Sequence, residues 1–185
     1  MSDGRSGAGA AAIQAALDAI YLAAIWSAGL AIFLMSLIVP WGVFTRYVLG
    51  SGSQWPEPIA ILLMMVFTFV GAAAAYRANA HIAVDMFTMR LPPALQRVCA
   101  VLVDVLMAVV CLFVIFYGTR LCIETWRQSI AELDWLPVGL TYAAIPVGSL
   151  LTLLFVLERM WLGPQTHRPV VNIVEADLSL APAVR

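Results

Sequence analysis

Residues 19–45 read AIYLAAIWSAGLAIFLMSLIVPWGVFT, a run of 27 residues without a charged side chain, bounded by Asp18 and Arg46. A helix needs about 20 apolar residues to cross the hydrocarbon core of a bilayer. A strand of a membrane barrel would alternate apolar and polar residues, which this run does not do. A cleaved signal peptide is the competing interpretation, but its apolar region would be only about 7 to 15 residues long. The run therefore predicts a transmembrane helix that stays in the protein.

Three further apolar stretches follow the first one. They contain 19, 22 and 23 residues, and the only charge inside any of them is Asp104. We expect four spans at about 19–45, 58–76, 98–119 and 135–157. The predicted fold class is an all-α integral membrane protein in which four transmembrane helices form a bundle. Residues 19–161 would be the membrane domain, between an N-terminal cytoplasmic segment (1–18) and a C-terminal cytoplasmic tail (162–185).

The composition of the whole chain supports a membrane protein. Of 185 residues, 63% are hydrophobic and 11% are charged, and the mean hydropathy is +0.94. Soluble domains carry about 25% charged residues. Disordered chains, nucleic-acid binders and secreted disulfide scaffolds need either many charges or many cysteines, so these classes are excluded. Cys99, Cys111 and Cys122 are too far apart on one helix for a disulfide and lack the spacing of a metal site.

The arginines near the predicted spans indicate the orientation of the chain. One side of the membrane would carry Arg5, Arg77, Arg90, Arg97, Arg159 and Arg168, and the other would carry Arg46, Arg120 and Arg127. Because cytoplasmic loops are enriched in basic residues, both termini and the central loop are predicted to be cytoplasmic. In that loop, residues 81–90 place apolar side chains on one helical stripe, which predicts a short helix along the cytoplasmic interface.

Asp104 is the one charge well inside a predicted span, and such a residue needs a partner. A structural ion pair with Arg77 or Arg97 is the interpretation we favour over an ion or proton site, since no second embedded acid completes a relay. His81 and Asp85 follow Arg77 at i+4 and i+8, so all these groups can converge beneath the bundle. A proton path through His81 is the alternative.

Enzymatic chemistry finds no support in the sequence. A bis-histidine haem needs two histidines on facing helices, but His81 and His167 both lie outside the predicted spans. No GxSxG, HExxH or glycine-rich phosphate loop is present. We therefore expect no enzyme and no cofactor. A stand-alone four-helix secondary transporter and a membrane-anchor subunit of a respiratory enzyme remain as alternative functions.

Several short motifs together resemble one known family in both order and spacing. They are Arg46-Tyr47, SQWPE at 53–57, GAAAAYR at 71–77, HIAVD at 81–85, LPP at 91–93 and YAAIPVG at 142–148. Over about residues 15–162 the chain resembles the DctQ family, the small membrane subunits of tripartite ATP-independent periplasmic (TRAP) transporters. The stretch SIAELDWLP at 129–137 departs from that family, which often has a Ser-Pro-Ala-Leu-like turn before its last helix.

The resemblance implies a subunit of the bacterial inner membrane that scaffolds a large, sodium-coupled permease subunit for uptake of an organic acid. A periplasmic binding protein would deliver the substrate, and the lipid bilayer is the remaining partner. The candidate residues for an interface or a structural charge cluster are Arg46, Trp55, Glu57, Arg77, His81, Asp85 and Asp104. Trp55 and Glu57 would form a periplasmic-side interface. The alternatives are a membrane-belt tryptophan and a carboxylate at the start of a helix.

Overall fold

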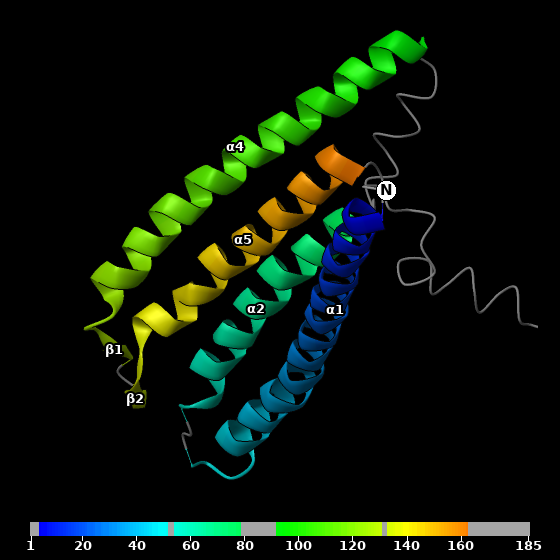
Figure 1. The fold of residues 1–185 in the computed structure, drawn as a ribbon. Helices are drawn as coiled ribbons and strands as arrows, with labels where there is room; N and C mark the ends of the chain where they lie inside the picture. The colour runs from blue at the N-terminus through cyan, green and yellow to red at the C-terminus, as the bar shows by residue number, and fades with distance from the viewer. Residues whose placement is uncertain (1–3, 52–53, 79–91, 131–132, 163–185) are drawn as a thin grey trace, which may run out of the picture.

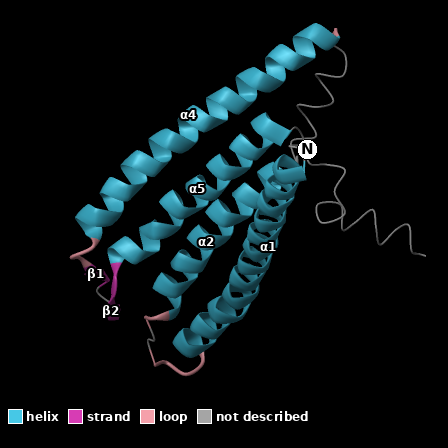
Figure 2. Cartoon of the chain, in the orientation of Figure 1, coloured by secondary structure: helices cyan, strands magenta, loops and turns pink. Residues whose placement is uncertain are grey.

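The computed structural model describes residues 4–51, 54–78, 92–130 and 133–162. Four long helices and a short hairpin make up this part of the chain (Figures 1 and 2). The helices are α1 (Gly4–Tyr47), α2 (Pro56–Arg77), α4 (Pro93–Thr125) and α5 (Val138–Leu162), and the hairpin consists of β1 (Ser129–Ile130) and β2 (Leu133–Pro137). The predicted interfacial helix at 81–90, with His81 and Asp85, lies outside the described residues.

Each of the four helices is long and apolar enough to cross a membrane. The apolar segments are Ile13–Tyr47, Pro56–Arg77, Val98–Thr125 and Val138–Trp161. The prediction of an all-α membrane protein with four transmembrane helices is confirmed.

The helices pack side by side in the order α1, α2, α5, α4 (Figure 1). The second helix contacts α1 and α5, and α5 separates it from α4. At one end of the row, α1 ends, α2 begins and the β1–β2 hairpin connects α4 to α5. We call this the hairpin end. At the opposite end, which we call the Arg77 end, α2 and α5 finish beside the first part of α1.

Every helix extends beyond at least one end of its expected span, and two of the helix starts have a local cause. The first helix already begins at Gly4, because the segment before Asp18 is rich in alanine, the strongest helix former. The last helix begins at Val138 rather than at residue 135. A residue that precedes proline disfavours the helical conformation, so no helix forms before Pro137, and the preceding residues pair with β1 instead.

The buried core lies toward the Arg77 end and is built from α1, α2 and α5. It consists of Tyr21, Ala24, Val70, Ala73, Ala74, Tyr76, Phe155 and Val156. Small residues bring the first two helices close together: a Cβ added at Gly71 would lie 3.7 Å from the Cβ of Ala28. The small residues of α2 thus serve packing within the chain, and they place the end of α2 between α1 and α5.

Candidate functional site

Arg77, the last residue of α2, forms a buried ionic cluster with one carboxylate from α1 and one from α5. Its Nε and Nη2 donate to the two carboxylate oxygens of Glu158 over 2.7 and 2.6 Å, and Nη2 also donates to Asp18 over 2.7 Å. The Arg77 side chain is 2% exposed and that of Glu158 is 1% exposed. A guanidinium paired side-on with a carboxylate fixes orientation as well as distance. Asp18, Arg77 and Glu158, the Arg77 cluster, therefore hold three helices in one arrangement.

Aromatic rings cover the Arg77 guanidinium. Its Cζ lies 5.1 Å from the centroid of the Tyr21 ring and 5.3 Å from that of Phe155. The two rings also meet each other edge-on, with centroids 6.3 Å apart. A cation close to an aromatic ring is attracted by its electron-rich face. The rings thus stabilise the positive charge and shield the Arg77 guanidinium from water.

A second polar cluster attaches α4 to the same end. The Tyr76 hydroxyl donates to Asp104 over 2.8 Å, and the Arg159 Nε lies 3.4 Å from the same carboxylate oxygen. Tyr76 and Arg159 each adjoin a member of the Arg77 cluster in sequence, namely Arg77 and Glu158. The two clusters together, here called the charge network, contain residues from all four helices.

The structure gives Arg77 and Asp104 partners other than those expected. In the described part of the chain they do not pair with each other, because Arg77 is paired with Asp18 and Glu158, while Asp104 is bound by Tyr76 and Arg159. The side chain of Arg97, the other expected partner of Asp104, lies outside the described part of the structure. His81 and Asp85 lie outside the described residues. Sequence reasoning missed Asp18, which it used only as a span boundary, together with Glu158 and the partner role of Arg159.

The chemistry of the charge network is that of a structural clamp. Among the described residues, no three His, Cys, Asp or Glu side chains lie close enough together to hold a metal ion. Arg77 uses its bidentate face on Glu158, and Asp104 accepts a hydrogen bond from Tyr76 and forms an ion pair with Arg159. Arg77 Nη1 is buried and has no hydrogen-bond partner among the described residues, whereas the other groups named here are bound to one another.

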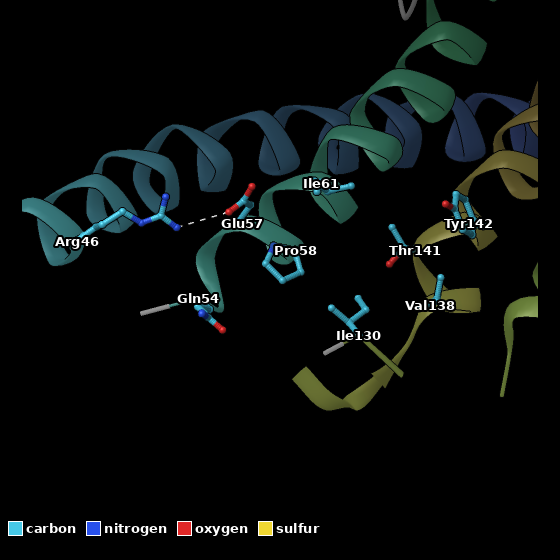
Figure 3. Close-up of a pocket in the computed structure, with 9 residues that line it drawn as sticks. All are labelled: Arg46, Gln54, Glu57, Pro58, Ile61, Ile130, Val138, Thr141 and Tyr142. Atoms are coloured by element: carbon cyan, nitrogen blue, oxygen red, sulfur yellow. Dashed lines mark ion pairs between the residues drawn. The ribbon is translucent and has the colours of Figure 1, made fainter. Parts of the chain in front are cut away.

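The hairpin end carries a pocket of about 360 Å³ in which charged and polar side chains lie beside apolar ones; we call it the polar pocket (Figure 3). Its lining comes from α1, α2, the hairpin and α5, and comprises Arg46, Gln54, Glu57, Pro58, Ile61, Ile130, Val138, Thr141 and Tyr142. The Thr141 side chain is buried, and its hydroxyl oxygen has no hydrogen-bond partner among the described residues.

The structure brings Arg46 and Glu57 together at the rim of this pocket. Arg46 Nη2 lies 3.6 Å from a Glu57 carboxylate oxygen, and the two side chains are 54% and 72% exposed. Glu57 occupies the first turn of α2, where a negative charge complements the helix dipole. Trp55 immediately precedes α2 and is partly exposed, but it lines neither this pocket nor the neighbouring groove.

An apolar groove of about 400 Å³ lies between α1 and α2, next to the polar pocket. The two hollows share Arg46, Glu57 and Ile61. The rest of the groove is lined by Met35, Val39, Gly42, Val43, Tyr47, Pro56, Ala60 and Met64. The Arg46–Glu57 pair thus lies between the polar pocket and the apolar groove.

Comparison with known proteins identifies the family. Residues 35–166 match the family model of the DctQ component of tripartite ATP-independent periplasmic transporters. The chain belongs to the DctQ family. The matched region includes Arg46, Glu57, Arg77, Asp104 and Glu158, so it contains most of the charge network and the pair at the pocket rim.

Curated relatives agree with this assignment. A TRAP transporter small permease protein of Haemophilus influenzae is 30% identical over 127 residues, which cover 69% of this chain and 78% of that protein. The sialic acid TRAP transporter small permease protein SiaQ of Vibrio cholerae is 27% identical over 128 residues, covering 67% and 71% of the two chains. The predicted resemblance is confirmed. This DctQ-family chain is a small permease subunit of a TRAP transporter, a transport protein with several membrane-spanning helices.

Proposed function

We propose that this small permease subunit is a rigid scaffold for a large, sodium-coupled permease subunit. The observation that carries the proposal is the charge network. Its members cross-link α1, α2, α4 and α5 at one end, and a network of hydrogen bonds and ion pairs around a buried arginine favours a single arrangement of the helices. A subunit held in this way suits a static role beside a partner that moves.

The substrate of the complex would be an organic acid. The relative from Vibrio cholerae is named for sialic acid, a carboxylate sugar, which is consistent with this substrate class. A periplasmic binding protein would deliver the substrate to the membrane subunits. The complex would lie in the bacterial inner membrane, with both termini of this chain in the cytoplasm.

Reconstitution tests the scaffold role directly. Liposomes that contain this chain alone should show no sodium-driven uptake of an organic acid, whereas liposomes that also contain its large subunit and binding protein should accumulate the acid. Empty liposomes are the control for leakage. Sodium-driven accumulation by the chain alone would overturn the scaffold role and favour a stand-alone transporter.

We further propose that Trp55 and Glu57 contribute to a periplasmic-side interface with the large subunit. Both are exposed at the hairpin end. Trp55→Ala and Glu57→Gln should reduce copurification of the large subunit. Trp126→Ala, which changes an exposed tryptophan after α4 at the same end, should not reduce it. If Glu57→Gln leaves copurification and uptake intact, Glu57 does not contribute to this interface, and its interaction with the helix dipole remains.

A further inference from the structure

The Arg46–Glu57 pair, shared by the polar pocket and the apolar groove, lies at the ends of two apolar segments, where the boundary between membrane and water is expected. The apolar segment of α1 ends at Tyr47, and that of α2 begins at Pro56. Arg46 and Glu57 each lie one residue inside these limits. Exposed Trp41 and Tyr47 accompany them on α1, and such aromatic side chains are typical of the headgroup level.

The Arg46 and Glu57 side chains at this boundary can form further hydrogen bonds. The separation of 3.6 Å between Arg46 and Glu57 exceeds the 2.7–2.9 Å or so of a close charge-assisted hydrogen bond. A guanidinium has five donors, and a carboxylate has two acceptor oxygens. The buried Thr141 hydroxyl adds a further polar group without a partner among the described residues.

The arrangement of charge and apolar surface matches an amphipathic, zwitterionic molecule. Arg46 offers a site for an anion, and Glu57 offers one for a cation beside it (Figure 3). From the same two residues, the groove continues along apolar side chains of α1 and α2. The two methionines of the groove, Met35 and Met64, have flexible side chains that can adapt to a hydrocarbon chain.

We propose that this two-part site binds one phospholipid whose headgroup carries both a phosphate and a primary ammonium group, as in phosphatidylethanolamine. The phosphate accepts hydrogen bonds from Arg46, and the ammonium donates to Glu57. One acyl chain lies in the groove between α1 and α2. Glu57 disfavours a purely anionic lipid, and a quaternary choline headgroup has no N–H to donate.

Native mass spectrometry of the full-length, delipidated chain tests the proposal. The probes are phosphatidylethanolamine, phosphatidylglycerol and phosphatidylcholine with identical acyl chains. Phosphatidylethanolamine should be retained about 1.4- to fivefold better than the other two, the range that an exposed ion pair contributes. Glu57→Gln should remove this preference, and Arg46→Gln should weaken retention of all three lipids.

Two further variants separate the site from general effects. Ala60→Phe places a larger side chain in the groove and should reduce retention of every lipid. Arg120→Gln, on the exposed surface of α4 outside both hollows, should leave retention and preference unchanged. Circular dichroism and gel filtration verify that each variant is folded.

Three results would overturn the proposal. They are equal retention of the three lipids by the unmodified chain, no retention of any lipid, and an unchanged preference in Glu57→Gln. The experiment uses this chain alone, so a negative result leaves the scaffold role intact. A failed reconstitution with the large subunit would in turn leave the lipid site intact.

Discussion

At the scale of single residues, the main feature is the burial of Arg77 and Glu158, whose side chains are 2% and 1% exposed. A buried ion pair is not in itself a source of stability, because both charges lose their hydration. Removing one partner is different, since it leaves the other charge buried and uncompensated. We therefore expect Arg77 to act as the counter-charge of Glu158 and Asp18 rather than in a chemical step.

Arg77→Ala should destabilise the folded chain by about 3–5 kcal/mol, the cost of breaking a buried ion pair from one side. Thermal unfolding in detergent measures this loss. Arg46→Ala is the matched control: its pair with Glu57 is exposed, so the loss there should be about 0–1 kcal/mol. The double variant Arg77→Met with Glu158→Met should recover part of the stability, since it removes both fully buried charges and loses only the contact of Arg77 with the partly exposed Asp18. Equal losses in the two alanine variants would contradict a clamping role for Arg77.

The sequence predicts the need for partners at Arg77 and Asp104 but not the partners themselves. Spacing along the chain places Arg77, Asp104, Glu158 and Arg159 near the same membrane face. It does not say which helix lies between which others. Because α5 packs between α2 and α4, it supplies the counter-charges to both sides. Which charges pair between helices therefore depends on the order in which the helices pack. That order is set by contacts between side chains that are far apart in the sequence.

At the scale of elements, the contact between α2 and α5 depends on Gly148. A Cβ added there would lie 2.6 Å from the Cβ of Phe69 and 2.8 Å from its backbone oxygen. The backbone cannot yield as a flexible side chain would, so the two helices would have to separate. Gly148→Ala should destabilise the chain by about 1–3 kcal/mol, as overpacking does, measured by thermal unfolding.

Gly29→Ala provides the control within the same kind of element. A Cβ at Gly29, in the interior of α1, would meet nothing within 4 Å. Alanine is favoured over glycine in a helix by about 1 kcal/mol, so this change should be neutral or stabilising. A loss in Gly29→Ala as large as in Gly148→Ala would attribute both effects to the backbone rather than to the α2–α5 contact.

The positions of the four spanning helices could be predicted because an uncharged run of about 20 residues in a membrane protein usually forms a transmembrane helix. The ends of the elements were harder to predict. Hydropathy alone does not show that the polar segment before Asp18 continues α1, or that residues 133–137 form a strand. Alanine content and the position of Pro137 carry that information, and both act locally.

At the scale of the whole molecule, the two ends of the helix row differ in character. The Arg77 end holds the buried charge network, whereas the hairpin end carries the exposed Arg46–Glu57 pair and the open polar pocket. The arginine distribution predicts that the Arg77 end faces the cytoplasm. With that orientation, the pocket would be accessible to partners from the periplasm.

Cysteine labelling tests this orientation in a variant without Cys99, Cys111 and Cys122. A cysteine introduced at Ser53 should react with a membrane-impermeant reagent in cells whose outer membrane is permeabilised, because the positive-inside rule places the α1–α2 connection in the periplasm. A cysteine at Ser6 is the control for the opposite end and should react only after the inner membrane is also opened. Tags at residue 2 and at the C-terminus should both report a cytoplasmic location. Protection of Ser53 together with labelling of Ser6 would reverse the orientation and place the pocket on the cytoplasmic side.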